Sequence, residues 1–360
     1  MSKKLSFVLL PQNNNFDLIR LICAILVIYG HANALTPPPA SENYTDFVYL
    51  LIGCHSSSIA VYIFFFLSGL LVTNSLITSR DAVKFICARL FRIYPGFLVL
   101  LFITTFLLGP ILTTSSLSSY FSIPNTYGYF IGNLFLITQH YLPGVFDANA
   151  YKSVVNGSLW TIKYELIAYL VIVFLFSINL LNRKSFLPIL GLVVITFIIS
   201  AYFPQLKGSS PLYLMLVFCI GVSLALWKEY IDVDYKITLI LCLLWLMTKH
   251  TFLNEFFLFL MVFSGMLFFS ANDYFRKVTL KYDVSYGVYL YGFLIAQMLA
   301  KYYPMLTIGW HQIITISLSL CVGLLSSIYI ENPMIKMGKL VGAYLNRRGF
   351  KLQQVKPDDV

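Results

Sequence analysis

The sequence predicts an all-α membrane protein, a polytopic helix bundle with about ten transmembrane helices and both termini in the cytoplasm. Of its 360 residues, 59% are hydrophobic and only 11% are charged, whereas a soluble domain carries about 25% charged residues. Apolar runs of about 20 residues, long enough to cross the hydrocarbon core of a bilayer, recur along the whole chain. Basic residues concentrate in alternate connections between these runs, which is typical of the cytoplasmic side.

Ten apolar runs qualify as transmembrane spans. The first run contains ionisable residues and is followed by further spans, so we interpret it as a retained helix and not as a cleaved signal peptide. In chain order, the expected spans are 15–35, 57–78, 93–113, 157–180, 186–204, 210–227, 237–252, 254–271, 284–303 and 309–331.

The connections between the spans are mostly short. The segment 36–56 is expected to be an outer loop, because its proline run cannot be helical. The stretch 114–156 contains one apolar piece, within 126–142, that is short for a span. We expect this piece to be re-entrant or interfacial, and an eleventh crossing stays open. We assign 1–335 to a single transmembrane domain and 336–360 to a basic cytoplasmic tail.

The net charge is +10, and the distribution of the basic residues agrees with the predicted topology. Few basic residues are expected on or near the outer side: Lys152, Lys163, Lys207, Lys249 and Lys301. We therefore interpret the basic excess as a topology signal combined with attraction to membrane lipid headgroups, and we expect no nucleic-acid partner. The six cysteines show no metal-ligand spacing, so we expect neither a metal site nor a disulfide framework.

The first span carries Asp17, Arg20 and His31 among apolar residues. Eleven helical residues turn about 1100° and rise about 16 Å, so Arg20 and His31 lie on one stripe of this helix. A charge inside a membrane usually faces a protein interior or an aqueous cavity and marks a site. The alternatives are an interfacial Asp17–Arg20 pair that anchors the span, and a buried His31 that a neighbouring helix satisfies.

Two further pairs of residues suggest chemistry. In the second span, Ser68 and Gly69 indicate close helix packing or, alternatively, backbone approach to a substrate. Before the third span, Arg89 and Arg92 lie three residues apart on one helical face. These arginines are either ordinary cytoplasmic charges or a site for a phosphate-bearing ligand, because guanidinium binds phosphate through paired hydrogen bonds.

Two glutamates lie in or beside late spans. Glu165 is expected about 10 Å inside the membrane, close to the depth of His31, where its carboxylate would orient the imidazole. Alternatively it pairs with Lys163 or is a structural polar group. Glu331 precedes Asn332 and Pro333, which favours a role in ending the tenth span.

The chain resembles the acyltransferase-3 family of integral membrane proteins, in particular its stand-alone carbohydrate O-acetyltransferases. The resemblance covers Phe16 to about Pro333 and rests on six segments in the same order: FDLIRLICAILVIYGH, FFFLSGLL, ARLFRIYP, SLWTIKYELIAYL, VSYGVYLYG and IENP. By position, Arg20 and His31 match the essential pair of the first span. Arg89 and Arg92 match the arginine motif linked to the acyl donor, and Glu165 matches the acidic residue after the tryptophan.

The resemblance implies an acyl-CoA-dependent acyltransferase of the bacterial inner membrane. Acetyl-CoA is the expected donor, as a substrate and not as a resident cofactor, held by Arg89, Arg92 and Arg20. The expected acceptor is a hydroxyl of a cell-envelope carbohydrate, such as lipopolysaccharide O-antigen or exopolysaccharide. We expect His31, oriented by Glu165, to be the general base. Succinyl transfer, an acyl-histidine intermediate and the oligomeric state stay open.

A transporter or flippase of an envelope lipid or sugar is the alternative function, since intramembrane charges suit it as well. The sequence shows no matching pair of interrupted helices in two halves, which is the usual sign of inverted transporter repeats. The enzyme is therefore the preferred hypothesis.

Overall fold

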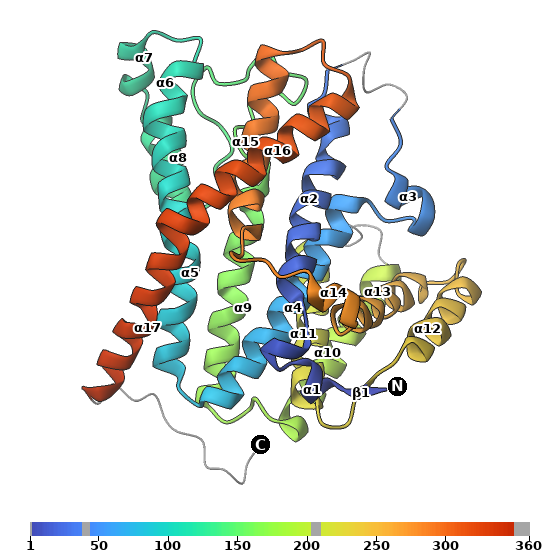
Figure 1. Ribbon diagram of the computed structural model, residues 1–360. Helices are drawn as coiled ribbons and strands as arrows, with labels where there is room; N and C mark the ends of the chain where they lie inside the picture. The colour runs from blue at the N-terminus through green and yellow to red at the C-terminus, as the bar shows by residue number, and fades with distance from the viewer. Residues whose placement is uncertain (1, 38–43, 203–209, 349–360) are drawn as a thin grey trace.

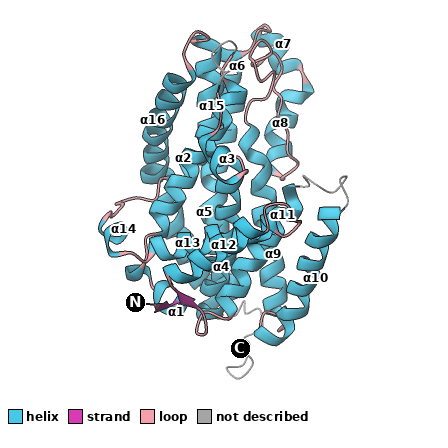
Figure 2. Ribbon diagram, turned by 90° about the vertical axis from the view of Figure 1, so that its right-hand side faces the viewer, coloured by secondary structure: helices cyan, strands magenta, loops and turns pink. Residues whose placement is uncertain are grey.

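Long helices account for most of the structure, a computed structural model that describes residues 2–37, 44–202 and 210–348. They run between one end of the molecule, marked by β1, and the opposite end, marked by α6 and α7 (Figures 1 and 2). Parts of three predicted segments lie outside the described residues: 38–43 of the outer loop, 203–204 of the fifth span and 349–360 of the tail.

The elements are as follows. The longer helices are α2 (Phe16–Leu35), α4 (Ser56–Ser79), α5 (Ala82–Phe102), α8 (Pro124–Leu134), α9 (Trp160–Ser177), α10 (Arg183–Tyr202), α11 (Ser210–Leu226), α12 (Tyr235–Met247), α13 (Asn254–Ser270), α15 (Ser285–Tyr302), α16 (Ile308–Ser326) and α17 (Asn332–Arg347). The short ones are α1 (Leu5–Val8), α3 (Phe47–Ile52), α6 (Gly109–Leu112), α7 (Leu117–Ser122) and α14 (Asp273–Lys277). Two-residue strands β1 (Lys3–Lys4) and β2 (Asp232–Val233) pair antiparallel.

The all-α prediction is confirmed, whereas the number of ten spans stays a prediction. Among the described residues, five helices are long and apolar enough to cross a membrane: Phe16–Leu35, Ser56–Ser79, Ala82–Leu112, Gly157–Ser177 and Ile308–Arg347. The expected spans 237–252 and 254–271 become α12 and α13, with 13 and 17 residues. At 1.5 Å per residue, α12 covers about 20 Å, which is less than the hydrocarbon thickness.

Two spans extend further than the apolar pattern indicated. The third begins at Ala82, where the Asp81 carboxylate accepts a hydrogen bond from the Lys84 amide, and it passes Pro95 without ending. The last continues from α16 through a π turn (Ser327–Glu331) into α17, so the expected domain boundary at residue 335 falls inside a helix. Arg89 and Arg92 therefore belong to the same helix as the membrane-crossing residues that follow them.

The stretch 126–142 contains no long helix. Only α8, with 11 residues, forms there, and it packs beside α5 and the π turn Ile103–Leu108. The residues between α8 and α9 form a loop at the end of the molecule opposite to β1, and side-chain hydrogen bonds tie this loop to α15. The 11 residues of α8 rise about 16 Å, which is too little to cross a bilayer.

Glycines bring the central helices together. A Cβ at Gly69 of α4 would lie 2.2 Å from the Phe218 carbonyl oxygen of α11, and one at Gly221 would lie 2.3 Å from the Phe66 oxygen. Small residues at such positions let two helix backbones approach closely inside a membrane. Gly69 therefore serves close packing of α4 against α11, the first of the two predicted alternatives. Its neighbour Ser68 faces the cavity that is described next.

Candidate active site

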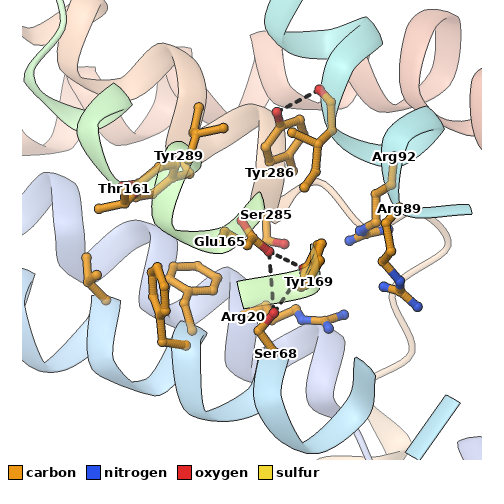
Figure 3. Close-up of a pocket in the computed structure, with 15 residues that line it drawn as sticks. Arg20, Ser68, Arg89, Arg92, Thr161, Glu165, Tyr169, Ser285, Tyr286 and Tyr289 are labelled. Atoms are coloured by element: carbon orange, nitrogen blue, oxygen red, sulfur yellow. Dashed lines mark hydrogen bonds between the residues drawn. The ribbon is translucent and has the colours of Figure 1, made fainter. Parts of the chain in front are cut away.

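Five helices, α2, α4, α5, α9 and α15, line a cavity with about 780 Å³ of empty space (Figure 3). The cavity is apolar over much of its wall, but it also collects three arginines and several hydroxyl groups from segments far apart in the sequence. Its polar lining residues are Arg20, Ser68, Arg89, Arg92, Thr161, Glu165, Tyr169, Ser285, Tyr286 and Tyr289. The predicted residues Arg20, Arg89, Arg92 and Glu165 are thus brought together.

Asp283 organises two of the arginines. Its carboxylate accepts a 2.5 Å hydrogen bond from Arg92 and lies 4.0 Å from Arg20, while its other oxygen accepts a 2.6 Å bond from the Ser285 hydroxyl. Burial disfavours the charge of Asp283, but the Arg92 and Arg20 guanidiniums outweigh that effect and lower its pKa to about 2. Arg20 also pairs with Asp17 at 3.4 Å, so the predicted surface pair exists beside the cavity contact.

Arg89 has a different environment. Its guanidinium lies over the Phe85 ring, 5.5 Å from the centroid. Its buried Nε has no hydrogen-bond partner among the described residues. Figure 3 shows Arg89 and Arg92 side by side at one end of the cavity. A buried donor without a partner costs free energy, so this group is available to an anionic ligand.

Glu165 does not contact His31. Its Oε1 accepts a short hydrogen bond from the Tyr169 hydroxyl and a long one, 3.5 Å, from Ser68. Ser68 and Tyr169 are also joined, at 2.9 Å between their oxygens (Figure 3). The expected contact in which the carboxylate orients the imidazole is therefore wrong for this structure, because Glu165 turns into the arginine-lined cavity.

His31 faces a second, smaller pocket of about 230 Å³. Its Nδ1 lies 2.7 Å from the Val27 carbonyl oxygen, one helical turn earlier in α2. Because a carbonyl oxygen only accepts, Nδ1 carries the proton and the neutral ring keeps its lone pair on Nε2. The Val27 carbonyl of α2 thus orients the ring, a role that the prediction assigned to Glu165.

Tyr289 separates the two pockets, since its side chain lines both of them. Its hydroxyl lies 2.6 Å from Thr161 Oγ1 and donates a 2.9 Å hydrogen bond to the Ser158 carbonyl. Sequence reasoning did not select Tyr289, Tyr286 or Asp283, although all three lie in or beside the quoted segment VSYGVYLYG. The aspartate before a helix start was the one signal that could have indicated Asp283.

Other predicted features lie outside the cavity. Glu331 is buried in the π turn that joins α16 to α17 and accepts a 2.7 Å hydrogen bond from Ser326. The described residues contain no cluster of three or more His, Cys, Asp or Glu side chains that could hold a metal. All six cysteines, which fall within the described part of the chain, are free.

The sequence signature of the family described as an acyltransferase domain matches residues 13–332, almost the whole length. The chain belongs to the acyltransferase-3 family. Among relatives of this acyltransferase, an O-acetyl transferase of Shigella phage Sf6 is 30% identical over 310 residues, 80% of this chain and 86% of the phage protein. Nodulation protein 10 of Rhizobium leguminosarum bv. viciae is 26% identical over 324 residues, 83% of this chain and 85% of that protein. No solved structure matches the acyltransferase significantly.

Proposed function

We propose that this acyltransferase moves an acetyl group from acetyl-CoA to a hydroxyl of a cell-envelope carbohydrate, in the inner membrane of a bacterium. The observation that carries the proposal is the adjacency of two pockets at Tyr289, one with three guanidiniums and one with a histidine Nε2. Thioester acyl transfer requires these two elements, a cationic site for the CoA phosphates and a base for the acceptor hydroxyl.

The donor binds with its diphosphate at the arginine end of the large cavity. Arg89 supplies a guanidinium whose Nε has no hydrogen-bond partner among the described residues, and Arg92 and Arg20 add charge that Asp283 holds in place. Bidentate hydrogen bonds from guanidinium to phosphate are strong and directional. The pantetheine arm then extends along the cavity, past Glu165 and Tyr169, toward Tyr289.

His31 acts as the general base. Its Nε2 takes the proton of the acceptor hydroxyl while that oxygen attacks the thioester carbonyl carbon and forms the new C–O bond. The C–S bond breaks as the tetrahedral intermediate collapses, and the imidazolium returns the proton to the leaving thiolate of CoA. The hydrogen bond from Nδ1–H to Val27 keeps the ring in the productive tautomer through both steps.

Glu165 acts within the donor cavity in this proposal. Its bonds to Tyr169 and Ser68 join α4 to α9 and hold the wall along which the donor arm would lie. Arg20 lies in the same cavity, eleven residues before His31 on α2, so one helix carries both a donor-binding group and the base.

The hydroxyl acceptor is supported by a relative that is named an O-acetyl transferase. The carbohydrate is the acceptor that the resemblance to the family implies. The apolar helices of the chain are consistent with catalysis within a membrane.

The test uses purified protein in lipid nanodiscs, acetyl-CoA labelled in its acetyl group, and envelope polysaccharide freed of O-acyl groups with mild alkali. We expect label on the polysaccharide with the wild-type protein, and at least a 100-fold slower transfer with His31→Ala, since general-base catalysis contributes about 10²–10⁴-fold. The control is His250→Ala, an exposed histidine of the α12–α13 connection. A folded His31→Ala protein with normal transfer, or polysaccharide that acquires no label from the folded wild-type protein, would refute the proposal.

A further inference from the structure

We infer that the small pocket beside His31 is the acyl subsite, and that Phe293 limits it to the acetyl group. The inference rests on the proposed function and deepens it by naming the pocket and the residue that restrict the acyl group. It follows from the size, the lining and the rigidity of this pocket.

The pocket is small and almost entirely apolar. Its empty volume of about 230 Å³, which includes space open to solvent, is less than a third of that of the arginine-lined cavity. Aliphatic side chains of α2 and the ring of Phe293 form most of its wall. At Gly292 even a Cβ would lie 2.7 Å from the Ile28 side chain, so the helices meet closely here. A short apolar acyl group suits such a space, whereas each further methylene needs room that the wall does not provide.

Phe293 is held in place on three sides. Its ring packs edge-to-face against His31, at 5.6 Å between centroids, and against Tyr151 of the loop between α8 and α9, at 5.9 Å. On a third side it lies against Gly157, where a Cβ would come within 2.7 Å of the ring. The side chain is 6% exposed. A ring confined in this way yields little to a longer chain, and it therefore acts as a fixed end wall next to the base.

The lining also selects against a charged acyl group. Apart from His31 and the Tyr289 phenol, none of the residues that line this pocket is titratable, and no Lys or Arg is among them. A succinyl group would bury its terminal carboxylate without a cationic partner, which is costly in an apolar environment. The arginines lie on the far side of Tyr289, where the phosphates bind.

The position of the pocket fits the path of the donor. Tyr289 lines both spaces, so a thioester that arrives from the arginine-lined cavity meets this residue before its acyl group reaches His31. The phenol hydrogen is used in a bond to the Ser158 carbonyl, so Tyr289 serves as a wall and not as a free donor to the thioester oxygen.

The experiment measures CoA release and polysaccharide acylation with acetyl-, propionyl-, butyryl- and succinyl-CoA, using the same nanodiscs and alkali-treated polysaccharide. The wild-type protein should prefer acetyl over propionyl by at least about 10-fold, since one extra methylene in a tight apolar pocket is worth about 10- to 200-fold. Phe293→Leu should raise the propionyl-to-acetyl ratio of kcat/KM at least about 10-fold. Succinyl-CoA should stay a poor donor with both proteins.

Tyr291→Leu is the matched control, because Tyr291 is a buried aromatic residue of the same helix that lines neither pocket. It should leave the ratio at the wild-type value. A wild-type protein that uses propionyl- or succinyl-CoA as well as acetyl-CoA overturns the acyl subsite, whether or not Phe293→Leu folds. A folded Phe293→Leu protein with an unchanged ratio overturns the role of Phe293. Absence of transfer from every acyl-CoA instead overturns the proposed function, and this inference with it.

Discussion

Arg89 and Arg92 lie one turn apart on α5 but differ in their partners. Arg92 is paired with the Asp283 carboxylate at 2.5 Å, whereas the Nε of Arg89 has no hydrogen-bond partner among the described residues. Of the two arginines whose spacing predicts a phosphate site, Arg92 thus has a carboxylate partner and the Nε of Arg89 has none among the described residues. Removing each should therefore have a different effect on stability.

We predict that Arg89→Ala raises the KM for acetyl-CoA about 10- to 100-fold, because a hydrogen bond to a charged group contributes about 1.5–3 kcal/mol. The Tm should change little, since this guanidinium forms no ion pair with any residue that the structure describes. Arg92→Ala should raise the KM and also lower the Tm, because it leaves Asp283 buried without its closest cation.

Steady-state kinetics and thermal unfolding in detergent check this pair of expectations. Arg347→Ala, at the exposed end of α17, is the control and should leave the KM unchanged. An Arg89→Ala protein with wild-type KM would mean that the donor phosphates do not bind at this arginine.

At the scale of elements, the contact between α4 and α11 positions the cavity wall. Gly69 and Gly221 each face a backbone carbonyl of the other helix at distances that no Cβ could occupy. Ser68, beside Gly69, then faces Glu165 and Tyr169 of α9. In α4, Gly69 therefore packs against α11, while the adjacent Ser68 lines the cavity.

We predict that Gly69→Ala destabilises the protein by about 1–3 kcal/mol, since the added methyl group would overpack a contact formed by backbone atoms. Thermal unfolding monitored by circular dichroism measures the effect. Gly128→Ala is the control, because a Cβ there meets nothing within 4 Å; alanine inside an exposed helix should be neutral or stabilise slightly. Equal unfolding temperatures for both variants would contradict the close contact.

At the scale of the whole molecule, the orientation in the membrane decides which compartment supplies the donor. In Figure 1, β1 and the last turns of α17 lie at the same end of the molecule, and α2 runs from the side of that end toward the opposite end. Arg20 is the fifth residue of α2. The basic residues of the predicted cytoplasmic segments favour placing this end in the cytoplasm, where CoA is available.

We predict that alkaline phosphatase fused after residue 348 is inactive, because that point is cytoplasmic in the proposed orientation. Phosphatase inserted between α15 and α16, at 303–307, should be active, because these residues lie at the opposite end. Green fluorescent protein at the same two points should give the opposite pattern. Phosphatase activity at residue 348 would reverse the orientation and place the arginines away from the CoA supply.

The sequence by itself determined the membrane class, the helical architecture and the four charged residues that line the cavity. Composition and apolar run length depend only on transfer free energies, so they can be read without coordinates. Arg20, Arg89, Arg92 and Glu165 could be selected because ionisable groups are rare and costly in apolar segments. All four line the same cavity.

Only the tertiary structure decided which of these groups meet. Helical spacing placed Arg20 and His31 on one stripe and Glu165 at a similar depth, but it left the rotation of α9 against α2 undetermined. In the structure Glu165 turns to Tyr169, and His31 is held by the Val27 carbonyl of its own helix. Tyr289 of α15 lines both pockets, and Phe293 of the same helix lines the small one. Asp283, just before α15, pairs with arginines of the large cavity. Depth along a helix follows from residue number, whereas its rotation depends on side-chain packing with other helices.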